Sequence, residues 1–454
     1  MSRMTCSTLS HCRGRRSGQQ AFRQRGAATL IVVMVLFFII SLVAAYTSRN
    51  IIFEQRTAAN QYTSEVSLQA ADAGLEWALG LLNSGRIDDN CASSSSVTST
   101  SFRQRYLQVS SDDGSIVALP NPATSLPRAS LPELAACWHN RASNEWVCQC
   151  PSTSGAIATT PTEPLAPSFS VRFIKLDEAY PMPASPTNPP PGLVAIEVKG
   201  CTSWDSACLA FEPVTLNRCR GTVCAQLALA SAVKSPPEGA ITARGAIDFG
   251  GAAVTAANAE VGAHGFAVVA GGTVNPTGMT PLGPPPSTGI VVPNDPGLAD
   301  PLFTPERMFA AIFGVWPSTY VEQPGAVKVD CSATCDSTTV RNAVEANPGR
   351  VLVLQGNVLL NGGSSIGTAT DPVVLMTTGN FGFSSSTDVY GLVYSRAPTW
   401  ATSGSGNIYG ALVAEGAIGG SGGFTVGYSK DILDRARWST GSFVMVPGSW
   451  KDFP

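Results

Sequence analysis

A serine flanked by glycines is the first candidate for chemistry in this sequence. Gly419-Gly420-Ser421-Gly422-Gly423 matches the G-x-S-x-G pattern that carries the nucleophilic serine of many hydrolases. In those enzymes the general-base histidine follows the serine in the chain, and no histidine follows Ser421. The stretch lies between two β-rich segments. We therefore expect a glycine-rich turn here, and we predict that the chain is not an enzyme.

A second candidate is a metal site built from cysteine and histidine. Cys137, His139, Cys148 and Cys150 offer thiolates and an imidazole, which are the usual ligands of zinc, but their C-x-H and C-x-C spacings are tighter than in zinc fingers. Of the 12 cysteines, an even number follows the apolar segment described below, which favours disulfides in an oxidising compartment. The candidates are Cys91, Cys137, Cys148, Cys150, Cys201, Cys208, Cys219, Cys224, Cys331 and Cys335.

The remaining candidate ligands and bases are few. Short spacing makes Cys201 with Cys208, Cys219 with Cys224, and Cys331 with Cys335 natural disulfide pairs, although sequence does not fix connectivity. Isolated turn aspartates mostly cap backbone amides, and those of this chain have no EF-hand spacing. We expect no cofactor, and a calcium site stays open without assigned ligands. The aspartates concerned are Asp295, Asp300, Asp330, Asp336, Asp371 and Asp388.

The amino-terminal segment sets the position of everything that follows. Residues 1–26 contain six arginines and no acidic residue, and without them the net charge changes from -3 to -9. An acidic remainder argues against a nucleic-acid partner. Residues 27–48 carry no charge, and at 1.5 Å per residue they would extend about 33 Å, enough to cross a bilayer core. The flanking arginines place the N-terminus in the cytoplasm and the bulk of the chain across the inner membrane.

The apolar segment continues into an amphipathic one without a helix-breaking residue. Leu68, Ala71, Leu75, Leu79 and Leu82 recur at helical spacing, and no proline interrupts residues 27–83. The sequence therefore predicts one continuous helix whose first half lies in lipid and whose second half packs on a domain. A conventional signal peptide has a shorter apolar core and a cleavage site at its far end. Because the apolar segment here is longer and continues into a helical pattern, we do not expect that cleavage.

These features together resemble a known family. The stretches RQRGAATLIVVMVL, EQRTAANQ and LQAADAGLEWAL are similar to the N-terminal region of PilX-type pilus assembly proteins, within the type IV prepilins and pseudopilins. The resemblance implies that a prepilin peptidase cuts after Gly26 and that the new N-terminus, Ala27, is methylated. Major pilins usually carry a glutamate at the fifth mature position, which is Ile31 here. A chain without this carboxylate cannot form the same charge pair with a neighbouring subunit. Among pilin-like proteins the lack is typical of minor subunits near the filament tip, so the resemblance implies a minor subunit.

The rest of the chain divides into a head and a glycine-rich half. Residues 91–167 have little periodicity and are predicted to be a loop-rich insertion, whereas 168–176, 192–200 and 222–233 are predicted strands. In the second half, PVVLMTTGN, GLVYSRAPT and GALVAEGAI begin 19 residues apart, at 372, 391 and 410. A repeat of about 20 residues with short strands predicts a β-solenoid, and a short helix is predicted at 305–316.

The predicted fold is therefore α+β, with a long N-terminal pilin-like helix packed on a small antiparallel sheet and followed by a mainly β domain. The predicted parts are a leader at 1–26, the helix at 27–84, a head with a Cys-rich insertion at 85–235, and the β-domain at 236–454.

The predicted function is that of a minor pilin-like subunit in initiation or tip assembly of a type IV pilus, with the β-domain displayed for adhesion. Expected partners are the major pilin and other minor pilins through the helix, the prepilin peptidase, and a tip adhesin or surface ligand. The expected location is the inner membrane, crossed once with the head in the periplasm, and then the extracellular pilus. Two alternatives stay open: a tip pseudopilin of a type II secretion system, and an inner-membrane-anchored β-solenoid adhesin or enzyme.

Overall fold

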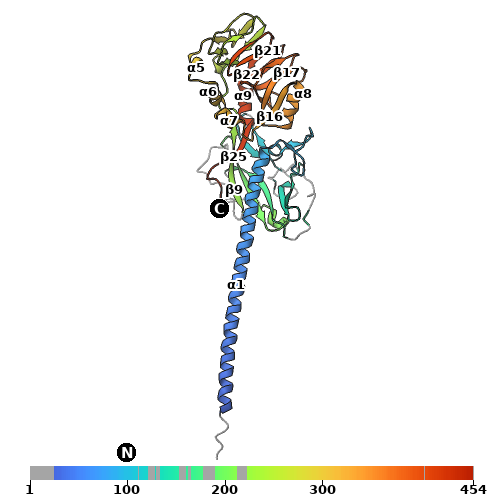
Figure 1. Cartoon of the computed structure of the whole chain (residues 1–454), viewed down its shortest axis with the longest axis vertical. Coiled ribbons are helices and arrows are strands. Elements are labelled where there is room, and N and C mark those ends of the chain that lie inside the picture. Colours follow the sequence, from blue (N-terminus) through green and yellow to red (C-terminus); the bar gives the residue numbers. More distant parts are fainter. Residues whose placement is uncertain are drawn as a thin grey trace, which may run out of the picture. The chain divides into compact units, whose positions relative to one another are not determined.

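The chain is α+β, with a long N-terminal helix followed by a region that is mostly β (Figure 1). The structure is a computed structural model, and it describes residues 25–110, 112–120, 128, 133–152, 160–161, 165–176, 190–211, 222–402 and 404–452. The chain divides into two compact units, Met1–Ser64 and Glu65–Pro454. Helix α1 (Arg25–Leu82) begins in the first unit and ends in the second, close to the predicted range of 27–83.

A six-stranded antiparallel sheet forms the core of the head. Its strand order is β25-β9-β8-β7-β5-β6. The three strands predicted at 168–176, 192–200 and 222–233 are confirmed as its central members. Their apolar residues alternate and one face packs on α1, but the strands are not half-buried as predicted. Every residue of β7 is buried, because Ser168, Ser170 and Arg172 on its other face are covered as well. The strands are β5 (Ala135–Asn140), β6 (Glu145–Gln149), β7 (Ser168–Ile174), β8 (Leu193–Cys201), β9 (Val223–Ser231) and β25 (Gly441–Met445).

The amphipathic end of α1 packs on this sheet. Ala71, Leu75, Ala78 and Leu82 are buried in one cluster with apolar residues of β7, β8 and β9, as the helical spacing predicts. The buried side chains are small where the helix lies closest to the strands. Each buried leucine contributes roughly 1.5–3 kcal/mol of hydrophobic stabilisation, so this stripe fixes the helix end on the head.

The segment predicted to be a loop-rich insertion contains more regular structure than its sequence indicates. Its described residues form a short helix and five strands, and β5 and β6 extend the main sheet as a hairpin, with Cys137 opposite Cys148. AACWHN and EWVCQ lack clean alternation, because their cysteines and tryptophans pack on both faces. The remaining elements are β1 (Arg86–Ile87), β2 (Thr100–Ser101), α2 (Phe102–Tyr106), β3 (Leu107–Val109), β4 (Ile116–Ala118) and α4 (Ser206–Leu209).

The glycine-rich half is inserted between two neighbouring strands of the head sheet. Strand β9 ends at Ser231, the chain forms the parallel sheets, and it then returns as β25, which pairs antiparallel with β9 in the register Ser231↔Gly441. In Figure 1 the red β25 lies beside the green β9. Part of the predicted 236–454 domain therefore belongs to the head sheet.

Parallel pairing dominates the inserted region. The largest sheet has 12 strands, and a three-stranded parallel sheet accompanies it. Successive parallel pairs run β15-β13-β10-β22-β20-β18-β17-β16. On one side of β22 the sheet continues through β10, β13 and β15, and also through β24, β12 and β14. On the other side it continues through β20, β18, β17 and β16.

The first strand of the region, β10, and its last strand, β24, both pair with β22, so the chain enters and leaves the sheet near its middle. The strands of the region are β10 (Ile241–Ala243), β11 (Ile247–Asp248), β12 (Val254–Ala257), β13 (Phe266–Ala270), β14 (Met279–Leu282), β15 (Ile290–Val292), β16 (Ala326–Cys335), β17 (Val351–Leu360), β18 (Val373–Thr377), β19 (Phe381–Phe383), β20 (Asp388–Ser395), β21 (Thr399–Thr402), β22 (Asn407–Ala414), β23 (Ala417–Gly420) and β24 (Thr425–Tyr428).

The 19-residue repeat corresponds to strands in matching register. Gly391 pairs with Gly410, and Tyr390 pairs with Tyr409, each at the predicted offset. Gly391 has φ 139°, and a Cβ on it would lie 1.8 Å from the carbonyl oxygen of Val373. Only glycine fits such a contact, which explains why the repeat keeps it.

Helices cover part of the outer surface of these strands. The predicted helix at 305–316 is confirmed as α6 (Pro305–Phe313), and Met308, Phe309, Ile312 and Phe313 are buried against β18, β20 and β22. Thr304 caps its N-terminus and Gly314 its C-terminus in the left-handed conformation. The other helical segments are η2 (Val261–Ala263), α5 (Pro296–Ala299), α7 (Pro317–Tyr320), α8 (Ser337–Ala346) and α9 (Lys430–Ser439).

Candidate functional site

The residues predicted for processing lie in the first turn of α1. The helix begins at Arg25, so the Gly26–Ala27 bond is helical, while the leader residues 1–24 lie outside the described part of the chain. Ile31, in the position where major pilins usually carry a glutamate, has 61% of its side chain exposed. Ile31 therefore presents an aliphatic side chain near the start of the helix, where major pilins have a carboxylate.

The first part of α1 exposes an almost continuous apolar surface. Between Leu30 and Phe53 its large apolar side chains are 48–71% exposed. Among the described residues one helix, from Thr29 to Leu82, is long and apolar enough to cross a membrane, with a mean hydropathy of 2.8 in its most apolar window. Lipid or other apolar helices would satisfy this surface, which water would not.

Two glycines let the second part of α1 approach the head sheet closely. A Cβ on Gly200 of β8 would lie 1.9 Å from the carbonyl oxygen of Ser67, and one on Gly74 would lie 2.7 Å from the ring of Phe169. Trp77 packs its ring edge-on against Phe169 at 5.3 Å. The helix thus sits on the sheet with little clearance, so its direction is set by the strands beneath it.

The comparisons with known proteins match this geometry at the N-terminus. Residues 25–76 match the family model described as PilX N-terminal. This part of the chain is similar to the N-terminal region of PilX-type proteins. The match covers the apolar part of α1 and most of the part that packs on the head, and it includes Gly26, Ala27 and Ile31. The matched segment, 52 residues of 454, is what this chain shares with that family.

The remaining comparisons add little to that assignment. No curated protein matches the chain. Among solved structures, the competence-associated pilin ComZ from Thermus thermophilus is similar over 86% of this chain and 97% of its own, at 11% identity and a TM-score of 0.20. That score is too low to support an argument about fold or function.

Disulfides close the head of the pilin-like protein. Cys91 bonds to Cys150, and Cys137 bonds to Cys148. All three cysteines considered as zinc ligands are therefore in disulfides. His139 instead packs edge-on against Trp146 at 5.3 Å. The predicted short-range pairs Cys201–Cys208 and Cys331–Cys335 are also present. Cys224 is disulfide-bonded, and its predicted partner, Cys219, lies outside the described residues.

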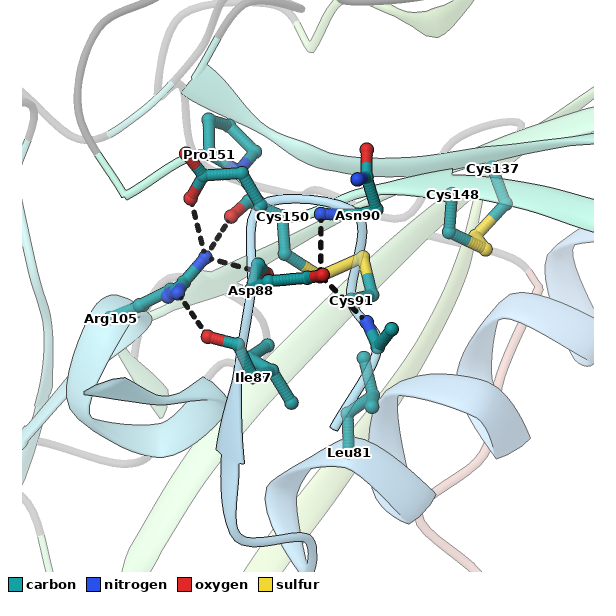
Figure 2. The surroundings of a disulfide bond; sticks show 12 residues. Leu81, Ile87, Asp88, Asn90, Cys91, Arg105, Cys137, Cys148, Cys150 and Pro151 are labelled. Carbon is teal, nitrogen blue, oxygen red and sulfur yellow. Dashed lines mark hydrogen bonds and ion pairs between the residues drawn. A yellow bond between two sulfur atoms is a disulfide. The ribbon is translucent and has the colours of Figure 1, made fainter. Parts of the chain in front are cut away.

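One arginine organises the loop around the Cys91–Cys150 bond. Figure 2 shows the guanidinium of Arg105 pointing at the backbone of Ile87, Asp88 and Cys150. It also forms an ion pair with Asp89 at 3.0 Å, and its side chain is only 3% exposed. The Asp88 carboxylate in turn accepts hydrogen bonds from two backbone amides of the same loop. The loop is therefore held by one buried cation and one disulfide.

A second arginine joins α1, the inserted region and the last strand. Arg103 donates to the carbonyl oxygens of Leu82, Gly349 and Gly441 at 3.0–3.1 Å. Burial and the nearby Arg350 charge lower the pKa of Arg103 to about 10, so it stays charged at neutral pH. Asn83 adds a two-way contact, since its amide donates to and accepts from the backbone of Phe443.

The chain end of the pilin-like protein also contacts α1. The Trp450 indole N–H donates to the Asp72 carboxylate at 3.0 Å, and Lys451 forms a backbone bridge with Cys224. Neither Trp450 nor Arg103 is among the residues that the sequence predicts to be functional. No local signal marks Arg103, because its carbonyl partners lie on segments distant in the chain.

The candidate catalytic and metal residues are not brought together. Ser421 is exposed in the turn between β23 and β24, as the glycine-rich pattern predicts, and His264 is exposed with φ 55°. Asp295 and Asp336 cap helices α5 and α8, and Asp388 accepts from Asn407. Within the described ranges, no group of three or more His, Cys, Asp or Glu residues is arranged to hold a metal.

The inserted region contains one buried acidic group with two partners. Glu415 is 4% exposed and accepts from the Tyr394 hydroxyl at 3.1 Å and from Arg396 at 3.2 Å. Burial raises the pKa of Glu415, and the Arg396 charge opposes this shift. Because Tyr394 and Arg396 also contact Phe309, the group fastens α6 to the strands. Its geometry indicates a structural role.

Proposed function

We propose that this protein is a minor pilin-like subunit that takes part in the initiation or tip assembly of a type IV pilus. The observation that carries the proposal is Ile31 within a PilX-type N-terminal helix. In a lipid-like helix bundle an aliphatic side chain is accommodated easily, whereas a subunit of the repeating shaft would use a carboxylate to meet its neighbour's amino terminus. A subunit without it fits a position at the end of the filament.

The insertion between β9 and β25 supports the same position. It adds the parallel sheets of residues 232–440 to a head whose own sheet has six strands. A subunit that repeats along a shaft must pack on neighbours on several sides, and an insertion of this size would obstruct that packing. At the tip no such packing is required, so the inserted domain can be displayed for contact with surfaces.

We also propose that the inserted region is a β-solenoid. Support comes from parallel strands at a 19-residue offset with equivalent residues in register, as between Tyr390 and Tyr409. In such a fold each turn buries its apolar residues against the next. The proposal assigns no catalytic step and no cofactor to the chain. Its partners are the prepilin peptidase, the major pilin and the other minor pilins.

The mature N-terminus provides the test. Mass spectrometry of the protein from membranes and from sheared pili should find N-methylated Ala27, at low abundance relative to the major pilin. The variant Gly26→Val should retain the leader and be absent from pili. Gly80→Ala is the control, because a methyl group there meets no atom within 4 Å, and it should behave as wild type.

Three results would contradict the proposal or replace it. An intact Met1 in the membrane protein, or a cut beyond Ser48, would exclude prepilin processing. Normal incorporation of Gly26→Val would exclude its dependence on that cut. Loss of protein secretion with pili unaffected, in a strain without the gene, would assign the chain to a type II secretion system.

A further inference from the structure

One face of the inserted domain carries two rows of side chains that are half-buried or exposed. In strands β20, β22, β24, β12 and β14, alternate residues point to opposite faces of the sheet. Val389, Ile408, Val426 and Ala256 point inward and are fully buried in the core of the domain. Their neighbours in sequence therefore point outward, and these outward residues form rows because the strands are parallel and in register.

The first row is aromatic and then ends abruptly. Tyr390 stacks on Tyr409 with ring centroids 4.9 Å apart and an interplanar angle of 21°. The next register partner of Tyr409 is Gly427, and Ala257 follows it. The next large side chain in this row is Leu282 on β14, which is 47% exposed.

The row therefore contains a notch above Gly427 and Ala257. A Cβ on Gly427 would lie 3.6 Å from Cδ1 of Tyr409, and no closer atom limits it. Adjacent strands lie about 4.8 Å apart, so Tyr409 and Leu282, three strand spacings from one another, are separated by about 14 Å. The two residues between them, Gly427 and Ala257, have no side chain larger than a methyl group. One ring face of Tyr409 consequently forms the wall of the notch and Leu282 forms the other wall.

The second row is polar and runs beside the notch. The register places Asp388, Asn407, Thr425, Thr255 and Thr280 next to one another along the strands. The Asp388 carboxylate accepts from the Asn407 amide at 2.7 Å, so its charge is already engaged. Three threonine hydroxyls follow beside the notch, and each can both donate and accept a hydrogen bond.

The charged groups near the notch are also engaged or lie at its end. Lys430, at the start of α9, forms an ion pair with Asp434 one helical turn further on, and that pair raises the pKa of Lys430. Glu260 lies on the loop after β12 and is half-buried. The floor and walls of the notch are thus uncharged, with an aromatic ring face on one side and hydroxyls along the edge.

We propose that this notch is a binding site for a neutral saccharide chain. A pyranose ring offers an apolar C–H face, which stacks on an aromatic ring, and hydroxyls around its edge, which pair with neutral donors and acceptors. Tyr409 provides the ring face, and Thr425 and Thr255 provide the hydroxyls at the edge. Among the described residues, the cation nearest in the fold, Lys430, is already paired with Asp434, which disfavours an anionic polymer.

The test uses the full-length protein in detergent with three neutral hexasaccharides: cellohexaose, maltohexaose and chitohexaose. Saturation-transfer NMR should show at least one of them binding. Gly427→Val puts a branched side chain into the notch, and Tyr409→Ala removes its wall, so each should weaken binding about tenfold or more. Gly363→Val and Trp316→Ala are matched controls at exposed positions elsewhere, and both should bind as wild type.

Failure of all three hexasaccharides to bind would overturn the proposal. So would binding that Gly427→Val and Tyr409→Ala leave unchanged while circular dichroism shows both variants folded, or preferential binding of heparin. The inference rests on the proposed function only for its biological setting outside the cell. Because the assay needs no filament, loss of saccharide binding and failure of N-terminal processing are separate results.

Discussion

The two sheet systems of this protein are stabilised in different ways. The antiparallel head sheet joins segments that are distant in the chain: the Cys91–Cys150 bond closes a separation of 59 residues, and β25 returns from the C-terminal end. The parallel strands from β16 to β22 instead pair with the next strand along the row, at offsets that range from 18 residues (Val373↔Gly391) to 25 residues (Ala326↔Val351). The head is held by long-range connections, and the inserted domain is held by repetition.

This difference locates the vulnerable positions of each part. In the head they are the residues that make single contacts across long separations, such as Arg103 and Asn83. In the inserted domain they are the positions that every strand repeats, because one oversized residue displaces two neighbours. Local sequence changes should therefore have different consequences in the two regions.

The largest effect is expected at a repeated position. Gly391→Val would place a Cβ 1.8 Å from the Val373 carbonyl oxygen and force a branched residue to φ 139°. We expect a loss of more than about 4 kcal/mol of unfolding free energy, measured by thermal unfolding. Gly427→Val, in strand β24 on the other side of β22, is the control and should cost no more than about 1 kcal/mol. Equal stability of both variants would mean that the repeat does not depend on close contact.

The second-largest effect on stability is expected from removing a disulfide, and it should be larger in the head than in the inserted domain. Replacing Cys91 and Cys150 by serine opens a 59-residue separation, whereas replacing Cys331 and Cys335 opens one of four. The chain-entropy estimate gives about 4 kcal/mol for the first and about 2 kcal/mol for the second. Denaturant unfolding of the two double variants measures both values. A larger loss from the Cys331/Cys335 variant would reverse the comparison.

The smallest effect is a pH dependence in the inserted domain. Because burial raises the pKa of Glu415 above its unfolded value of about 4.3, the stability linked to its protonation is present below that value. It is lost as the pH rises through the folded-state pKa. Relative to Glu415→Gln, the wild type should lose up to about 1 kcal/mol between pH 4 and pH 7. Unfolding curves across this range measure the difference, and a constant difference would contradict the assignment.

Local patterns in the sequence were sufficient for much of the fold. The continuous helix, three head strands, α6 and the 19-residue register follow from periodicity, because each depends on residues close together in the chain. The short-range cysteine pairs follow for the same reason. The N-terminal family resemblance rests on the same local stretches, and the family match covers residues 25–76.

What the sequence did not reveal depends on distant pairing. The return of β25 to β9, the order of strands around β22, and the carbonyl partners of Arg103 have no local pattern. The cross-strand pair Cys137–Cys148 was missed as a hairpin because its strands do not alternate. The close contact of Gly200 with Ser67 was also invisible, since a single glycine in a strand is consistent with many roles.

The pairing of Ser231 with Gly441 has a further consequence. Residues that are opposite one another at the end of an antiparallel pair can be linked by a two-residue turn. The head would then be a complete six-stranded sheet with a hairpin at its edge, and residues 232–440 are a cassette set into that hairpin. Such a cassette can be exchanged, lengthened or removed without changing the residues of α1, because that helix ends at Leu82, well before the point of insertion.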